Sequence, residues 1–343
     1  MLVYLFIAVT PFFLHLAFIT AEDRVAKKLF IATGIGVTLL IGLRDQIGSD
    51  WDAYLAWYEF ARDNDFLTTM LASDPGYMAL NWFLAQFDLT IYAVNTFCAL
   101  IFCIGVFSYC AKEPLPWLAL ILAIPYLVLV VAMNYTRQSV AIGLFLYSLL
   151  ACRSGSLWKA IAFLVGAVLF HKSAIVFSYI LFFQRKRSPL VMLLLSSTCI
   201  FFGYVMLQES FGMVVTQYIE LQMSSEGALY RTVLNVFFAI IFICFIRKNS
   251  LYSSDASVLF SFSIVAIFSL LLVSSASTFV DRLSLYLAPL QLSVLPRLIS
   301  SYRNRYTLFV AALCLSAFSL LFIWIFGTYS PNATAFIPYK FIF

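Results

Sequence analysis

Charged residues are scarce in this chain. They make up 11% of its 343 residues, whereas hydrophobic residues make up 63%, and the mean hydropathy is +0.98. A water-soluble domain keeps roughly a quarter of its residues charged, so this chain has too few charges to cover a water-facing surface. Long apolar runs recur along the chain, as in helices that satisfy their backbone hydrogen bonds within lipid. The composition predicts an integral membrane protein of the all-α class.

Metal-binding and redox motifs are also lacking. The seven cysteines lie in or beside apolar runs and form no CxxC pair, and the chain has two histidines. Zinc sites of the usual kind need clustered cysteine and histidine ligands at defined spacings. We therefore expect packing cysteines, no metal site and no cofactor.

Apolar runs separated by charged breaks predict a polytopic transmembrane helical bundle of about 12 spans, in a range of about 11 to 14. The first run has no basic flank and no small-residue cleavage site, so we expect a retained helix rather than a signal peptide. A single membrane domain then covers residues 1–343, with outer loops at about 44–88 and about 209–230. The expected spans are 2–20, 29–43, 89–110, 115–133, 138–151, 157–170, 173–184, 189–208, 231–246, 256–276, 283–297 and 306–327.

Lysine and arginine positions predict the orientation of these spans. With the N-terminus outside, 14 of the 21 basic residues fall on the inner side and 12 of the 16 acidic residues fall on the outer side. Inner loops of membrane proteins carry an excess of Lys and Arg, so we predict this orientation, with both termini outside. The apolar stretch 75–87 is only 13 residues long. We expect a re-entrant or interfacial helix there; a further full span is the alternative, but it would reverse every later loop.

Four arginines on the outer side lie at the ends of separate predicted spans. A guanidinium at the edge of the hydrocarbon is costly unless it meets an anion or water, and arginine matches phosphate oxygens two at a time. Their convergence would make a site for a doubly charged phosphate. The alternatives are that each reaches lipid headgroups or pairs with a loop acid, as Asp281 beside Arg282 suggests. The four are Arg44, Arg137, Arg231 and Arg282.

Other outer residues have side chains suited to proton transfer or sugar binding. His171, between two short spans, is of a type that can take a proton from a hydroxyl near neutral pH, although a lone histidine is more often structural. Asp50 and Asp52 follow Gly48 and Ser49, and a carboxylate there could act as a general base or hold sugar hydroxyls. An ordinary acidic loop is the alternative.

Aromatic residues in the loop 44–88 are spaced for a helix. Trp51, Tyr54, Leu55 and Tyr58 would share one face of a short helix lying at the membrane interface. Flat rings such as those of Trp51 and Tyr54 suit stacking against a sugar. An interfacial aromatic belt without a ligand is the alternative.

Several stretches resemble, in order, those of the EpsG/Wzy-type polysaccharide polymerases. The run from Arg44 through Gly48 and Asp50 to Tyr54 is similar to the family signature R-x-x-x-G-x-D-x-x-x-Y. Residues 74–77 (DPGY), 133–141 (MNYTRQSVA) and 170–174 (FHKSA) resemble further family stretches, and 281–286 (DRLSLY) resembles an R-x-S-x-Y segment. Together the matches run from about residue 42 to residue 286.

The resemblance implies a multi-pass enzyme of the bacterial inner membrane with its active site, and here both termini, facing the periplasm. Members are taken to be glycosyltransferases that join undecaprenyl-pyrophosphate-linked oligosaccharide repeats into O-antigen, capsule or exopolysaccharide. The implied partners are a lipid-linked donor and acceptor, membrane lipids and a chain-length regulator, without nucleic acid, sugar nucleotide or metal. On this hypothesis the pyrophosphate is bound by Arg44, Arg137, Arg231 and Arg282.

The same hypothesis assigns the remaining site residues. Arg137 is counted as catalytic, and either His171 or Asp50 takes the acceptor proton. The residues assigned to the sugar are Asp52, Trp51, Tyr54, Tyr77 and Gln138.

A flippase or other transporter of the lipid-linked sugar, a glycan ligase and a non-catalytic lipid-binding protein are the alternatives. Transporters place their charged sites near the bilayer midplane, whereas here the unusual charges lie on one face. That placement favours one-sided chemistry. The sugars, the linkage, the stereochemical outcome, the oligomeric state and the choice between polymerase and ligase are left open.

Overall fold

The computed structural model describes residues 1–18, 24–183, 227–302 except 247–254, and 304–343. Helices make up the secondary structure of these residues, apart from an isolated bridge between Arg44 and Phe341. The predicted all-α class is confirmed. The first half contains α1 (Leu2–Ala17), α2 (Arg24–Gly42), α3 (Trp51–Asp63), α4 (Phe66–Ala72), α5 (Pro75–Ala85), α6 (Ile91–Cys110), α7 (Pro116–Ala123) and the π-helix η1 (Ile124–Ala132).

The rest of the described chain is also helical. Its helices are α8 (Thr136–Arg153), α9 (Leu157–Phe170), the 3₁₀-helix η2 (Lys172–Phe183), α11 (Ala228–Ile241), the π-helix η4 (Phe242–Ile246), α12 (Ala256–Leu272), α13 (Ser277–Leu285), α14 (Ala288–Ser300), α15 (Arg305–Tyr329) and η6 (Pro331–Ala335).

Long apolar helices are fewer than the sequence predicted. Among the described residues, four are long and apolar enough to cross a membrane: α2, α6, α15 and the segment Ala228–Phe245. The pair α13 and α14, bent by 48°, makes a fifth if it counts as one span. The expectation of about 12 spans was wrong, because other apolar runs form helices of 10–17 residues, such as α1, α9 and α12, and a span needs roughly 20 residues. The expected span 189–208 and most of the expected loop 209–230 lie outside the described residues.

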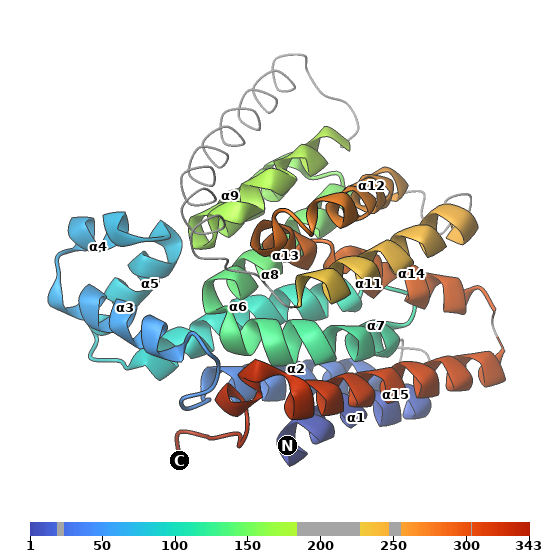
Figure 1. Cartoon of the computed structure of the whole chain (residues 1–343), viewed down its shortest axis with the longest axis horizontal. Helices are drawn as coiled ribbons and strands as arrows, with labels where there is room; N and C mark the ends of the chain where they lie inside the picture. Colours follow the sequence, from blue (N-terminus) through green and yellow to red (C-terminus); the bar gives the residue numbers. More distant parts are fainter. Residues whose placement is uncertain (19–23, 184–226, 247–254, 303) are drawn as a thin grey trace.

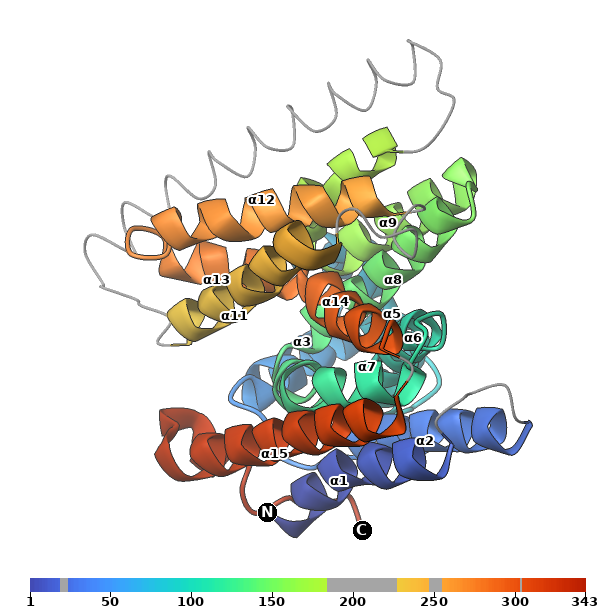
Figure 2. The same ribbon diagram turned by 90° about the vertical axis from the view of Figure 1, so that its right-hand side faces the viewer.

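The helices pack in layers. α1, α2 and α15 lie along one edge of the molecule, with α6 and α7 next to them (Figures 1 and 2). In one direction α2 packs on α6, α6 on α8, and α8 on α9. On the opposite edge α11 contacts α12, α13 and α14. The long apolar helices identify a multi-pass membrane protein.

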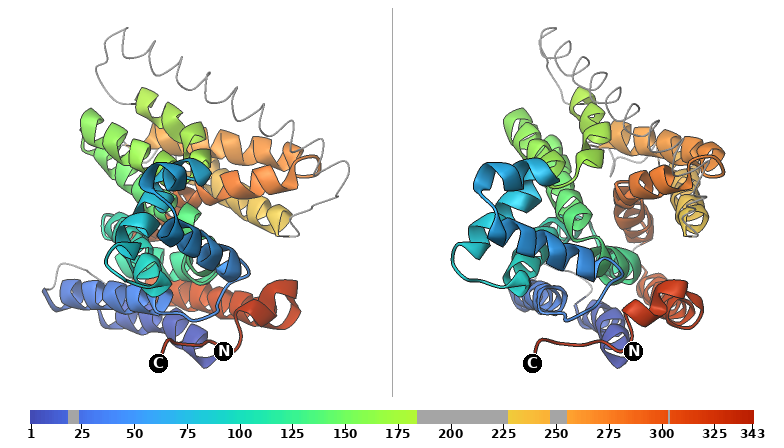
Figure 3. Two further views of the ribbon diagram at one scale, coloured as in Figure 1. Left: turned by 90° about the vertical axis from the view of Figure 1, so that its left-hand side faces the viewer. Right: turned by 60° about the vertical axis from the view of Figure 1, so that its left-hand side comes forward.

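The loop 44–88 folds into three short helices, α3, α4 and α5, which lie together at one end of the molecule (Figures 1 and 3). The predicted short helix with an aromatic face is confirmed: in α3, Trp51, Tyr54 and Tyr58 are buried. They pack in one core cluster with Tyr77 and Met78 of α5. The 11-residue α5 itself packs on α3, α4 and α9. The aromatic face of α3 is therefore covered by protein.

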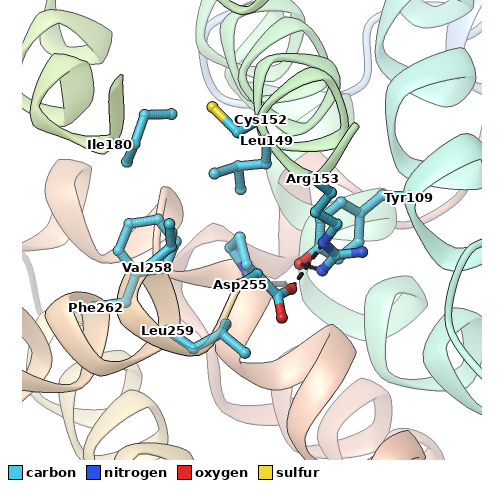
Figure 4. A pocket seen from close by; sticks show the side chains of 10 residues that line it. Tyr109, Leu149, Cys152, Arg153, Ile180, Asp255, Val258, Leu259 and Phe262 are labelled. Atoms are coloured by element: carbon cyan, nitrogen blue, oxygen red, sulfur yellow. Dashed lines mark hydrogen bonds and ion pairs between the residues drawn. The ribbon is translucent and has the colours of Figure 1, made fainter. Parts of the chain in front are cut away.

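Two arginines and two carboxylates form a buried network where α6, α8, α12 and α14 meet. Arg297 donates to Glu113 at 2.6 and 2.9 Å and to Asp255 at 2.8 and 2.9 Å. Arg153 contacts Glu113 at 2.9 Å and Asp255 at 2.7 Å. The four formal charges cancel, and both carboxylates contact both arginines. A small pocket adjoins the network, where Arg153, Asp255 and Tyr109 face apolar side chains (Figure 4).

Candidate functional site

The sequence stretches singled out above gather at the opposite end of α8 from this buried network. Arg137 stands in the first turn of α8 and Arg153 ends it. Sixteen residues of helix separate them by about 24 Å, since each residue advances the helix by about 1.5 Å. The chain therefore carries two charged clusters near opposite ends of one buried helix.

Arg44 anchors the loop that follows α2. Its side chain is 1% exposed, and its guanidinium donates to the carbonyls of Ile41 at 2.6 Å and Ile47 at 3.3 Å and to Thr136 Oγ1 at 2.9 Å. These bonds curl the loop and attach it to the start of α8. The observed contacts of Arg44 are therefore those of a loop support, and the pyrophosphate contact predicted for it stays a prediction.

Backbone pairing fixes the same loop from both sides. The amides of Asp45 and Gly48 donate to the carbonyls of Lys340 and Ala335, at 3.1 and 2.9 Å, in the C-terminal segment. Gly48 has φ +99°, and a Cβ there would lie 2.4 Å from the Met133 carbonyl oxygen. Only glycine tolerates this conformation and this approach. The loop therefore delivers the next acid, Asp50, to the segment before α8.

Asp50 is within electrostatic range of two of the predicted arginines. It is half-buried, and its backbone amide donates to Asn134 Oδ1 at 3.3 Å. Burial raises the pKa of the Asp50 carboxyl, and the positive charges of Arg137 and Arg282 oppose that rise. Arg137, at the start of α8, and Arg282, in α13, thus both act on Asp50, at the start of α3.

Arg137 and His171 share a carboxylate that the sequence reasoning did not assign to the site. Arg137 Nη1 donates to Asp74 Oδ2 at 2.9 Å and to Ser73 Oγ at 2.7 Å, and the same Asp74 oxygen is 3.5 Å from His171 Nδ1. Asp74 was part of a family-like stretch, but nothing in its neighbours along the chain indicated a partner 97 residues away. Two predicted catalytic residues are thus joined through a third.

Burial raises the pKa of the Asp74 carboxyl, but this effect is outweighed. A hydrogen bond from His171, the charges of His171 and Arg137, and the backbone N–H of Lys172 hold the pKa of Asp74 below its ordinary value. Asp74 is therefore ionised at neutral pH.

Arg231 and Arg282 differ in their surroundings. Arg231 forms an ion pair with Asp281, and its guanidinium lies 5.2 Å from the centre of the Tyr126 ring. The pairing of Asp281 with Arg282, one alternative from the sequence, is therefore not the one observed. The Arg282 side chain is exposed and has no ion pair among the described residues. Of these two arginines, Arg282 is the one open to an anionic ligand.

A family model described as the EpsG family matches residues 27–341, almost the whole chain. The chain belongs to the EpsG family. No curated protein and no solved structure matches it. The family resemblance drawn from the sequence is confirmed, and membership indicates a membrane protein of polysaccharide biosynthesis.

Most of the residues assigned to sugar binding are buried in this EpsG-family protein. Trp51, Tyr54 and Tyr77 are buried in the core of the α3–α5 unit, whereas Asp52 is exposed on α3. Gln138 is buried and donates to the backbone carbonyl of Arg282 at 3.0 Å, which ties α8 to α13. Their sugar contacts stay predictions. Within the described ranges, no three His, Cys, Asp or Glu side chains are grouped to hold a metal ion.

Proposed function

We propose that this EpsG-family protein is a polysaccharide polymerase. It transfers a growing undecaprenyl-pyrophosphate-linked glycan onto the acceptor sugar of another lipid-linked repeat at the periplasmic face of the bacterial inner membrane. The observation that carries the proposal is the gathering of Arg137, Arg282, Asp50 and His171 at one end of the bundle. The predicted orientation, which places this end outside, supports the periplasmic location.

Arg137 and Arg282 bind the donor pyrophosphate in this proposal. Transfer breaks the bond between the anomeric carbon and the pyrophosphate oxygen, so negative charge grows on that oxygen. Guanidinium groups already in place stabilise such charge without reorganising. Arg282 is exposed, and Arg137 is three-tenths exposed at its side chain (28%), so both are accessible to a ligand. Arg231 is already paired with Asp281, so its contact with the pyrophosphate stays a prediction.

His171 is the preferred general base, with Asp50 as the second candidate. The Asp50 carboxylate feels the charges of the two arginines that would hold pyrophosphate, and a carboxylate there would repel the donor's own charge. His171 is separated from Arg137 by Asp74, which contacts both side chains. This arrangement keeps the base apart from the anion-binding group.

Deletion of the gene in its host, with the surface polysaccharide resolved on a gel, tests the function. We expect the length ladder to collapse to a single-repeat band, and wild-type protein but not Arg137→Ala to restore it. Arg62→Ala is the matched control, because Arg62 is an exposed arginine on α3 that pairs with its neighbour Asp63; it should restore the ladder fully.

The alternatives give different bands in the same experiment. Repeat units trapped on the cytoplasmic side would identify a flippase, and full-length chains stranded on the lipid carrier would identify a ligase. An unchanged ladder after deletion would exclude all three activities for this pathway. The deletion phenotype therefore distinguishes a polymerase from a flippase and from a ligase.

A further inference from the structure

The two nitrogens of the His171 ring have different surroundings. Nδ1 lies 3.5 Å from Asp74 Oδ2. Nε2 is buried and has no hydrogen-bond partner among the described residues. A buried nitrogen left without a partner is costly and points to a ligand or a reaction. In a neutral imidazole one nitrogen carries the proton and the other accepts, so the partner of Nδ1 decides what Nε2 can do.

Three segments hold the Asp74 carboxylate in place. Asp74 directly precedes α5, and its carboxylate accepts from Arg137 Nη1 of α8 at 2.9 Å. It also faces the His171 ring and the backbone N–H of Lys172, where α9 ends and η2 begins. Gly76 permits this approach, since a Cβ there would lie 3.0 Å from the Leu169 carbonyl and from the Phe170 ring. The first turn of α5 is therefore packed directly against Leu169 and Phe170, the two residues before His171.

We propose that Asp74 is a positioning residue for His171. Its carboxylate accepts the Nδ1 proton and so keeps the neutral ring in the tautomer with a lone pair on Nε2. It also stabilises the imidazolium that forms when Nε2 takes a proton. That this proton comes from the hydroxyl of the acceptor sugar rests on the proposed function. The side chains that enclose Nε2 must part to admit this hydroxyl.

The acceptor oxygen attacks the anomeric carbon of the donor while its proton passes to His171 Nε2. The bond between that carbon and the pyrophosphate oxygen breaks, and its electron pair goes to the pyrophosphate, which Arg137 faces. His171 then returns the proton to water. Asp74 keeps its charge throughout, and because it contacts both Arg137 and His171 it fixes the distance between the anion-binding group and the base.

Nitrogen NMR of the full chain tests the tautomer directly. The protein contains two histidines, His15 and His171, so labelling its histidine rings with ¹⁵N gives two sets of signals, and His171→Gln assigns them. At a pH where the ring is neutral we expect the His171 proton on Nδ1. In Asp74→Asn the amide oxygen can still accept from Arg137 while its NH₂ group faces the ring, so the proton should move to Nε2. An Nε2 proton in wild type, or no change in the variant, overturns the proposal.

Kinetics of the purified protein with lipid-linked repeats supply the second readout. We expect Asp74→Asn to lower kcat by about 100-fold or more, the usual range for loss of general base catalysis, with KM changed less than about threefold. Asp63→Asn, an exposed acid on α3, is the control and should match wild type. A merely structural Asp74 would lower kcat without altering the tautomer, and that result also overturns the proposal.

Misfolding of Asp74→Asn and failure of the proposed polymerase function can both be distinguished from failure of the positioning role of Asp74. If Asp74→Asn does not fold, the wild-type tautomer and Asp74→Glu decide, since glutamate keeps the charge and should keep the Nδ1 proton. If the tautomers behave as expected but wild-type protein forms no polymer, the proposed function fails while the contact between Asp74 and His171 stands.

Discussion

The two ends of α8 carry the same kinds of side chain in different states. At one end Arg153 and Arg297 face Glu113 and Asp255, every side chain is at most 14% exposed, and each carboxylate contacts both arginines. At the other end Arg282 is exposed without an ion pair in the described part of the chain, and His171 Nε2 is buried without a partner there. The two ends of α8 therefore differ in how completely their charged and polar groups are paired.

The complete pairing in the buried network of Arg153, Arg297, Glu113 and Asp255 has a structural explanation. Taking a charge out of water is costly, and a buried ion pair recovers that cost only where the remaining hydrogen-bonding positions are filled. Ser293 donates to Glu113 at 2.9 Å and Tyr109 lies under the Arg153 guanidinium at 4.3 Å. These contacts complete the network and fasten four helices where they meet. At the other end of α8, Arg282 is exposed and His171 Nε2 has no partner among the described residues.

The largest effect should come from breaking the buried network. Arg297→Ala leaves Glu113 and Asp255 with one arginine between them, and removing one member of a buried pair costs about 3–5 kcal/mol. We expect a much lower melting temperature in detergent, or little folded protein. Arg62→Ala, which removes an exposed arginine, should melt like wild type. A stable Arg297→Ala protein would refute the structural assignment.

Arg137→Lys should come next, and it should act on activity. Lysine keeps the charge but cannot contact phosphate with two parallel donors or reach Ser73 and Asp74 together. We expect about 100-fold slower polymerisation, equal to about 2.7 kcal/mol, with the melting temperature close to wild type. Wild-type rates in this variant would remove Arg137 from the site.

Arg282→Ala should have a smaller effect that distinguishes binding from folding. Its side chain is exposed and makes no ion pair within the described residues, so its removal should leave the melting temperature unchanged. Loss of one contact to pyrophosphate should raise the KM for the donor by about tenfold, or about 1.4 kcal/mol. An unchanged KM would leave Arg137 as the main anion ligand.

The smallest effect concerns Asp50 and pH. Because burial raises its pKa in the folded protein, the folded state holds this proton more tightly than the unfolded state, and stability is lost as pH rises through the raised pKa. Asp50→Asn should therefore melt slightly higher than wild type at pH 7. The gain should vanish below the ordinary aspartate pKa of 3.8. A variant that melts lower at pH 7 would show that the two nearby arginines outweigh burial.

The sequence predicted parts of this molecule because they depend on neighbours along the chain. The aromatic spacing from Trp51 to Tyr58 predicted α3, and the composition predicted an all-helical membrane protein. Twelve spans were wrong because apolarity marks a run without showing where its helix ends or bends, as at the break between α13 and α14. Whether a run crosses the bilayer depends on packing that composition does not report.

Contacts between distant segments could not be predicted from the sequence, because they also depend on how the helices pack. Glu113 and Arg297 are 184 positions apart, and Asp74 and His171 are 97 apart. The sequence of a single chain indicates which reactions and bonds a side chain can make, but not which distant residue it contacts. For Arg44, nothing in the sequence indicated that its guanidinium donates to Ile41, Ile47 and Thr136, and its pyrophosphate contact stays a prediction. Family-like stretches at 74–77 and 170–174 contain Asp74 and His171 but did not reveal the contact between them.

The most direct test of the central claim is polymerisation by the purified protein in lipid vesicles, with lipid-linked repeat units as both donor and acceptor. We predict a ladder of lengths from wild-type protein without any sugar nucleotide, and none from folded Arg137→Ala protein. A ladder from Arg137→Ala at the wild-type rate, or no polymer from wild-type protein, would contradict the account.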